Sequence, residues 1–233
     1  MEGMSHWLAS MVLVVALIVV VAVTLGAQDA PPRTPAGPLV ARFLQSKERP
    51  PTSYRARRRL QAENLRFKKS AWIEVITEFA GGQMNYTVTG RGGSELVQNR
   101  VLLPALDAER ELLRERRELA LTEANYQFTE EGPAGEGLTR IRLIPLRKDR
   151  RLLDGFLLVT ADADLVEITG KLAKPPSFWT TSVTLTRHYR KIGGIRVPAS
   201  VTSVAEVRIA GRSTFSMTYE FEIIDGVQVA RPR

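Results

Sequence analysis

The sequence contains no cysteine and only two histidines, and these absences exclude several kinds of site. Without cysteine there is no thiol nucleophile, no Cys-based zinc site, no disulfide framework and no lipidated cysteine of a lipoprotein. His6 lies in an apolar N-terminal stretch, so His188 is the histidine of the remaining chain. Charged residues make up 25% of the 233 residues, which excludes a bundle of membrane helices for most of the chain.

Basic residues outnumber acidic residues, and the formal net charge is +8 at pH 7. A basic balance of this kind suits nucleic acid, anionic lipid or acidic protein partners. The compartment in which the chain works decides between them.

The N-terminal stretch predicts export. Residues 11–25 are almost wholly apolar, two small residues follow, and a polar, proline-rich segment comes next, which is typical of a signal peptide cleaved near Ala27. We therefore expect a leader over 1–27, a linker over 28–37 and one domain over 38–233. The n-region lacks Lys and Arg and the apolar run is long enough to span a bilayer, so an uncleaved anchor is the alternative. Both place the domain in the periplasm, free or anchored to the inner membrane, and no nucleic-acid partner is expected.

Alternating apolar and polar residues predict β-strands through much of the chain. The pattern is clearest over residues 195–209 and 213–223, whose odd positions are mostly apolar. Glycine turns at 193–194 and 210–211 join these segments, which predicts antiparallel hairpins in a curved meander with an apolar concave side.

The same alternation over 53–64 and 69–80 predicts two paired strands with an outer charged face. The residues expected to face one another there are Arg55, Arg57 and Arg59 on one strand and Glu74 and Glu78 on the other.

Helical segments interrupt the strands. Residues 94–121 are dense in charge and carry leucines at helical spacing, and Pro104 suits the first turn of a second helix. A short helix is expected over 38–45, and the glycine-rich stretch 131–137 is expected to be a loop. The fold class predicted is mainly β (α+β).

Apolar side chains of inward phase are expected to line the concave side. Large, adaptable side chains suit an apolar ligand of variable shape, while the alternative is that they pack as ordinary core. The candidate ligand-binding residues are Ile73, Val75, Phe79, Tyr86, Leu143, Val183, Leu185, Phe215, Met217, Tyr219 and Phe221.

Arg58 and Arg187 break the apolar phase of their strands, and a buried charge needs a partner. Either both lie near strand ends and extend to solvent, or they rim a cavity. At a rim they would hold a carbonyl, phosphate or carboxylate group, or fasten a helix across the opening. Leu106 and Leu113 are the candidate lid residues of that helix.

No catalytic constellation is apparent. Asp162 and Asp164 lack further ligands at calcium-loop spacing, residues 90–93 lack the ending of a phosphate loop, and His188 has no visible orienting motif. We expect no enzymatic activity, no cofactor and no metal.

Four phrases carry a resemblance to a known family: SYRARRRLQAEN, GKLAKPPSFWTTSV, RVPASV and RIAGRSTFSMTYEFEIIDG. With the export signal and the strand–helix layout, they resemble the LolA/LolB superfamily of periplasmic lipoprotein carriers and the related lipid-sensing domain of envelope-stress regulators. They are most similar to exported bacterial proteins described as lipoprotein-sorting-like. The resemblance covers roughly Val40 to Val229.

The resemblance implies an unclosed antiparallel β-barrel, or half-barrel, that wraps one or two helices, with acyl chains bound between sheet and helices. The helix from Pro104 would plug or cover the concavity, and Arg58 is the nearest candidate, by its phase, for the carriers' lid-locking arginine. Lipid or an acylated protein would be the partner, with contacts to the envelope membrane surface and a role in sorting to the outer membrane. The alternative is an envelope scaffold or regulatory partner with a filled core and no lipid cargo.

We predict that the mature chain begins near Gln28. N-terminal sequencing of protein recovered from the cell envelope is the test. An intact Met1 or Met4 terminus would favour the anchor, and a cytoplasmic location would contradict both.

Overall fold

The computed structural model describes residues 37–46, 49–115 and 121–230. The expected leader and nearly all of the expected linker lie outside these ranges. Among the described residues, no helix combines the length and the apolar character needed to cross a membrane.

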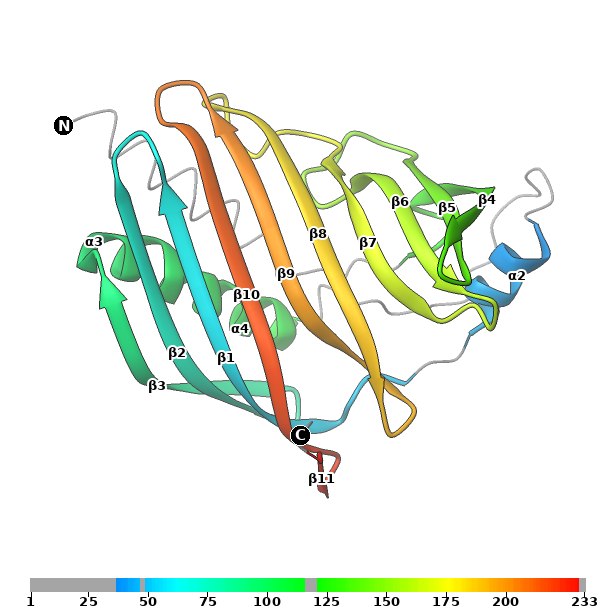
Figure 1. Ribbon diagram of the computed structural model, residues 1–233, viewed down its shortest axis with the longest axis horizontal. Helices are drawn as coiled ribbons and strands as arrows, with labels where there is room; N and C mark the ends of the chain where they lie inside the picture. The colour runs from blue at the N-terminus through cyan, green and yellow to red at the C-terminus, as the bar shows by residue number, and fades with distance from the viewer. Residues whose placement is uncertain (1–36, 47–48, 116–120, 231–233) are drawn as a thin grey trace.

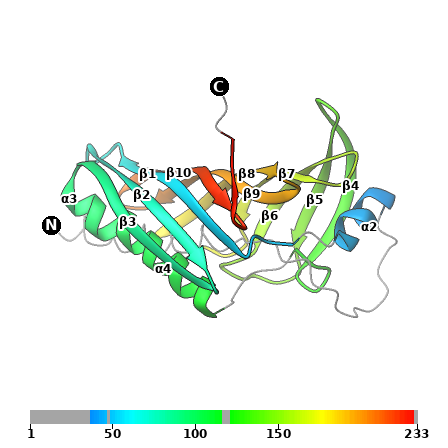
Figure 2. The ribbon, with the colours of Figure 1, turned by 90° about the horizontal axis from the view of Figure 1, so that it is seen from below.

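One antiparallel sheet carries the fold (Figure 1). Its strands lie in the order β3–β2–β1–β10–β9–β8–β7–β6–β5–β4, and β11 pairs with β10. The sheet curves without closing, so β3 and β4 form two separate edges (Figure 2). This is the mainly β (α+β) half-barrel wrapping helices that the sequence predicts. The strands are β1 (Ser53–Asn64), β2 (Lys69–Ala80), β3 (Gln83–Gly93), β4 (Tyr126–Gly135), β5 (Leu138–Pro145), β6 (Leu153–Thr160), β7 (Leu165–Leu172), β8 (Thr180–Ile192), β9 (Ile195–Val207), β10 (Gly211–Ile224) and β11 (Val227–Gln228).

A continuous helical segment connects β3 to β4. It comprises α3 (Glu95–Val97), a π-helical turn η1 (Gln98–Leu102) and α4 (Leu103–Glu115). Pro104 lies in the first turn of α4, as predicted, directly after the π-helical turn of the same segment. The segment lies along β3, β2 and β1 on one side of the sheet, which is the inner side (Figure 2). Residues 116–120 of the predicted helix lie outside the described ranges.

Helix α2 (Pro38–Gln45) packs near the other edge of the sheet, beside β4. Its apolar side buries Val40 and Phe43, and the ring of Phe43 lies 6.4 Å from that of Phe128 on β4. Arg42 donates a hydrogen bond to the Ala161 carbonyl, 2.9 Å away, in the turn between β6 and β7. The predicted short helix is confirmed.

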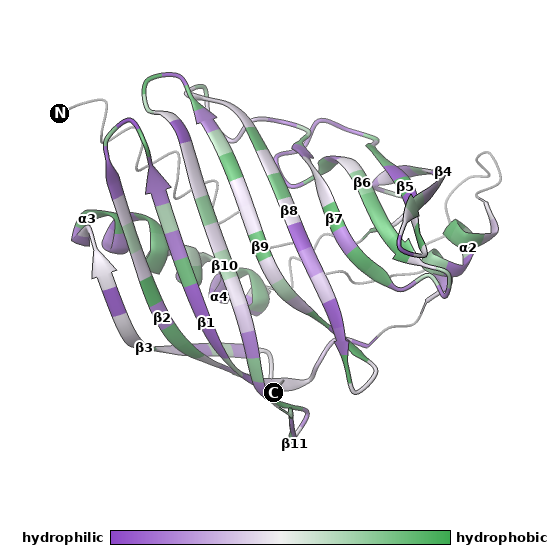
Figure 3. Ribbon diagram, viewed as in Figure 1, coloured by the Kyte–Doolittle hydropathy of each residue, from purple (hydrophilic) through white to green (hydrophobic). Residues whose placement is uncertain are grey.

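The strands alternate in hydropathy along their length, as the banding of Figure 3 shows. The alternate residues Ala56, Arg58, Leu60, Ala62 and Asn64 of β1 are buried, while the arginines between them reach the outer, convex face. A period of two gives each strand one face in the core and one in water.

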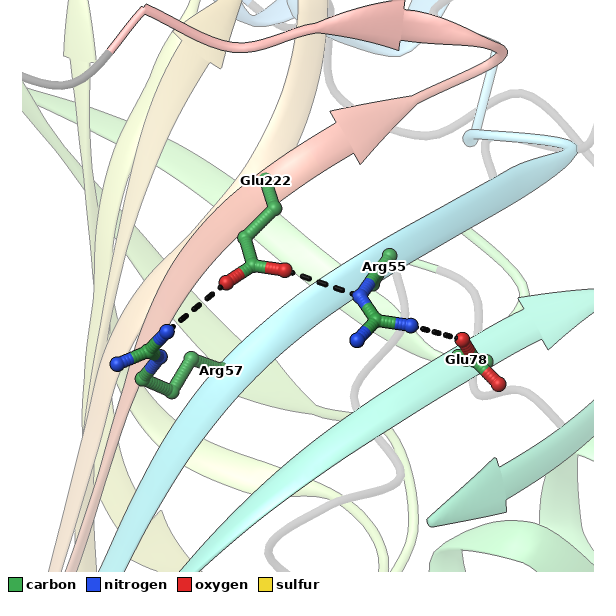
Figure 4. A network of polar contacts seen from close by, with 4 residues as sticks. All are labelled: Arg55, Arg57, Glu78 and Glu222. Carbon is green, nitrogen blue, oxygen red and sulfur yellow. Dashed lines mark hydrogen bonds and ion pairs between the residues drawn. The ribbon is translucent and has the colours of Figure 1, made fainter. Parts of the chain in front are cut away.

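Ion pairs connect neighbouring strands on the convex face (Figure 4). Arg55 contacts Glu78 of β2, and Arg59 lies 2.5 Å from Glu74, as expected from the sequence. Arg57 instead pairs with Glu222 of β10 at 3.2 Å, and Glu222 also accepts from Arg55 at 3.0 Å. The prediction for Arg57 was incomplete because the neighbour of β1 on its other side is 165 residues away in sequence.

The stretch 131–137 is not a loop, contrary to expectation. Strand β4 continues to Gly135, and only Glu136 and Gly137 form the turn. Positive φ angles of 102° at Gly132 and 86° at Gly135 let the backbone skip two residues of the register and still pair with β5. Edge strand β3 has a similar bulge, because Gly90 and Val88 pair with consecutive residues of β2.

A second correction concerns Ile209, which the alternation placed on the inner face. Strand β9 ends at Val207, and Ile209 lies in the turn before β10 with 38% of its surface exposed.

Candidate functional site

The inner face of the sheet is mostly apolar. The register places each predicted lining residue beside an inward neighbour, for example Leu60 between Ile73 and Met217. Thr184 and Thr186 alternate with inward Val183 and Leu185 and point outward, because the Thr186 hydroxyl lies 2.7 Å from that of Thr169 on the convex side. Phe79 and Tyr86 are half-buried; the nine buried residues of the predicted set are Ile73, Val75, Leu143, Val183, Leu185, Phe215, Met217, Tyr219 and Phe221.

Aromatic rings fill the inner face near the N-terminal end of β1. Tyr54 stacks on Phe79 at 5.3 Å between ring centroids and meets Phe221 edge-on at 5.5 Å. Tyr219 stacks on Phe221 at 6.1 Å. These contacts join β2, β1 and β10 through large side chains rather than through the backbone ladder alone.

A buried ion pair connects this face to helix α4. The Arg58 guanidinium lies 2.5 Å from the Glu109 carboxylate, and no part of the Arg58 side chain is exposed. Arg58 also donates to the Tyr219 hydroxyl at 3.3 Å, and its guanidinium lies 4.6 Å from the centroid of that ring. The thioether sulfurs of Met84 and Met217 complete its surroundings. Arg58 is therefore the residue that fastens the helix to the sheet.

The electrostatics of Arg58 follow from these neighbours. Burial acts to lower its pKa, but the Glu109 carboxylate and the Tyr219 and Tyr54 hydroxyls raise it by more, so the pKa of Arg58 lies above its usual value. The guanidinium stays charged, and a buried charge is tolerated because Glu109 opposes it. One donor, Nε of Arg58, has no hydrogen-bond partner among the described residues.

Arg187 of β8 is also interior, with 6% of its surface exposed. Its guanidinium lies 5.2 Å from the centroid of the Tyr189 ring. Burial acts to lower the pKa of Arg187, and Tyr189, Tyr219 and Glu109 raise it by more. Both inward arginines thus belong to one electrostatic cluster on the inner face. The interpretation that they reach solvent from strand ends is wrong.

Helix α4 carries the two predicted lid residues and one that the prediction missed. Leu106 is buried and Leu113 half-buried. Glu109 was not predicted, although the signal is present: it lies three residues after Leu106 and four before Leu113, on the same stripe. At the outer side of the helix, the Tyr86 hydroxyl donates to Asp107 at 2.9 Å.

His188 has a carboxylate neighbour that the sequence did not reveal. Its Nδ1 lies 3.3 Å from the Glu167 carboxylate, and Ser200 is opposite it on β9. The three side chains form a row on the convex face, but His188 makes no hydrogen bond to Ser200. His188 and Glu167 form a contact at the surface of the sheet.

Acidic side chains form no metal site in the described part of the chain. Asp162 and Asp164 lie in the turn between β6 and β7, and Asp164 contacts Lys191. A hollow of about 330 Å³ lies by strands β1, β2 and β10, and its lining residues are Arg57, Arg58, Arg59, Glu74, Thr218, Tyr219 and Glu220. It is a gap beside exposed ion pairs and not the apolar site expected from the sequence.

No protein-family model matches the chain, and no curated protein matches it in sequence. The solved structures that are similar to it include two of low sequence identity. A DUF1329 family protein from Desulfovibrio piger is 11% identical, with a TM-score of 0.42 over 78% of this chain and 88% of that chain. A LolA superfamily protein from Nitrosomonas europaea is 10% identical, with a TM-score of 0.40 over 81% of this chain and 92% of that chain. A member of the superfamily that the sequence phrases resemble is thus among the chain's structural neighbours.

The Arg58–Glu109 pair gives a stability prediction. Glu109→Gln removes the charge opposite a buried guanidinium and should lower the free energy of unfolding by about 3–5 kcal/mol. The matched control is Glu111→Gln on the same helix, whose exposed pair with Arg114 should change it by about 0.5 kcal/mol or less. Urea denaturation measures both.

A double variant distinguishes the cost of an unopposed charge from the cost of changing the side chains at these two positions. Combining Arg58→Met with Glu109→Leu removes both charges and should restore most of the lost stability, because apolar pairs often replace buried ion pairs without loss. Equal stability of Glu109→Gln and Glu111→Gln would contradict the role of the pair.

The tyrosines give a pH prediction. All five have raised pKa values: burial raises those of Tyr54, Tyr189 and Tyr219, burial also raises that of Tyr126 to about 12, and burial with the bond to Asp107 raises that of Tyr86 to about 12. A folded pKa above the unfolded value of 10.0 means that this stabilisation is complete below about pH 10 and is lost as the pH rises toward 12. Phenolate absorbance should therefore show no folded tyrosine titrating near pH 10. A tyrosine that titrates there, with an unchanged urea midpoint, would refute the assignment.

Proposed function

We propose that the chain is a non-enzymatic cell-envelope protein of carrier or sorting type, which binds the acyl chains of lipid or of an acylated protein against the inner face of its half-barrel. The observation that carries the proposal is the form of the site: a wide apolar face on which the crossing helix is fastened by a buried ion pair.

The apolar face supports the proposal by its composition. Phe215 and Met217 of β10 and Val183 and Leu185 of β8, two strands that flank β9, are apolar side chains on the inner face. Met has three rotatable bonds and a polarisable sulfur, so it adapts to a flexible chain. Sequestering one fourteen-carbon acyl chain could gain on the order of ~10 kcal/mol before ordering costs, at ~0.8 kcal/mol per CH₂.

The ion pair supports it by its chemistry. A helix packed permanently on a sheet gains as much from apolar contacts as from a buried ion pair. The hydrogen bonds of an ion pair are directional and break together when the two residues move apart. This suits a helix that moves away from the sheet when a ligand enters. The unpaired Nε of Arg58 and the Thr77 hydroxyl, which also lacks a partner among the described residues, offer hydrogen-bond donors for the polar end of a ligand.

One observation favours the second candidate, an envelope scaffold or regulatory partner with a filled core. Every lining residue of β5, β8 and β10 in the predicted set has 7% or less of its surface exposed. Under this alternative the same side chains are ordinary core and no lipid is bound. Native mass spectrometry of protein purified from its own envelope distinguishes the two by the presence or absence of a bound lipid.

Two charge insertions one residue apart test lipid binding. Leu185→Glu places a carboxylate on the inner face and should abolish binding of a fluorescent fatty acid. Thr184→Glu, the matched control, faces the convex side and should leave binding and folding unchanged. Fluorescence titration measures binding, and circular dichroism checks the fold.

Leu185→Glu could unfold the domain, so Met217→Ala serves as a milder companion that should weaken binding and keep the fold. The proposal fails if well-folded wild-type protein binds no acyl probe, or if folded Leu185→Glu binds it normally.

A further inference from the structure

The two ends of the sheet differ in charge. At one end, the lower edge in Figure 1, the connections are short and rich in glycine, with acidic residues in three of them and no Lys or Arg. They are residues 81–82, 136–137, 161–164, 193–194 and 225–226.

The connections at the opposite end, the upper edge in Figure 1, are basic. Residues 65–68, 173–179 and 208–210 contain Lys or Arg and no acidic residue. The fourth connection, residues 146–152, contains four cations and one acid, Asp149, which Arg151 binds at 3.2 Å. The connections at the two ends therefore differ in charge, and at the glycine-rich end Asp164 contacts Lys191 and Asp225 lies 3.1 Å from Arg49.

Large apolar side chains are exposed among these cations. Phe178 has 71% of its surface exposed, Leu65 64% and Ile209 38%. A single exposed apolar residue is ordinary, but here three of them lie on the tips of neighbouring connections that also carry Arg66, Lys68, Lys174 and Arg208. We call the connections 65–68, 173–179 and 208–210 the basic rim.

Contacts hold the basic rim together as one surface. Buried Asn64 donates to the Ala210 carbonyl at 2.9 Å, which joins the first turn to the third. The Arg208 backbone N–H donates to the Trp179 carbonyl at 2.8 Å, and the Arg208 guanidinium lies 4.5 Å from the centroid of the Phe178 ring. The exposed tips are thus presented side by side by adjacent strands.

We propose that the basic rim docks on the surface of an anionic lipid bilayer, with Phe178 and Leu65 entering the interface. Apolar tips flanked by cations match a membrane interface, where apolar groups enter the boundary of the acyl region and Lys or Arg meet anionic headgroups. The inference goes beyond acyl binding by the inner face and does not depend on it.

The absence of cysteine makes a local measurement possible in the full chain. Leu65→Cys, labelled with an environment-sensitive fluorophore, reports on the basic rim. Val227→Cys is the matched control, since Val227 is 68% exposed and lies at the acidic end. We expect a blue shift at position 65 on phosphatidylglycerol vesicles, loss of that shift on phosphatidylcholine vesicles or at high salt, and none at position 227. Because the readout is local, it is independent of how the N-terminal stretch meets the vesicle.

Two further variants in the Leu65→Cys background, with one control variant, test which residues of the basic rim contact the bilayer. Phe178→Ser and Lys174→Gln should each reduce the blue shift, whereas Arg190→Gln, an exposed cation toward the acidic end, should not. The proposal is overturned if position 65 shows no shift on anionic vesicles, if it shows the same shift on phosphatidylcholine, or if position 227 shifts equally.

Discussion

The antiparallel pairing of β1 with β10 is the contact on which the rest of the structure depends. It joins the first three strands to the last seven long ones and makes one sheet from two groups that would otherwise expose their edges. Its register sets Arg58 beside Tyr219, 161 residues away in sequence, and Leu60 beside Met217. The helical segment that follows β3 lies on the inner side of the sheet, along β3, β2 and β1. Such a non-local pairing favours slow folding, because loop-closure entropy is lost before the contacts form.

In the contact between helix α4 and the sheet, the interactions that stabilise the helix differ from those that fix its position. Leu106 gives the helix apolar burial, but a leucine stripe allows small rotations and slips. The Arg58–Glu109 pair accepts one position, since displacing Glu109 leaves a buried guanidinium unopposed. In the arrangement described, the pair fixes the place of α4 on the sheet.

Much of the fold could be predicted from the sequence because its strands bury one face each. Alternation identified the phase of β8 and β10 and the outer ion pairs of Arg55 and Arg59, all of which depend on local spacing. The β1–β10 pairing could not be predicted, because period two fixes which face a residue occupies but not which strand lies alongside. The length of β4 was missed because Gly132 and Gly135 look like turn residues and here form bulges.

Only part of the candidate site could be predicted from the sequence, for the same reason. The inward residues followed from phase, whereas the partner of Arg58 lies on a helix whose charged residues are many. Glu109 stands out only once the leucine stripe is aligned, where it replaces an apolar residue. Its role as the counter-charge depends on tertiary distance, which no local pattern contains.

The bulges of the two edge strands affect how the protein associates with other molecules. An open sheet presents two rows of backbone groups that can recruit a strand from another molecule. In β3 the register skips a residue between Gly90 and Val88, and in β4 it skips two around Gly132, Pro133 and Gly135. Each irregularity interrupts the template, and proline withholds a donor. A half-barrel with unclosed sides is thereby protected from growing strand by strand into fibrils, so it can remain open without becoming a seed for aggregation.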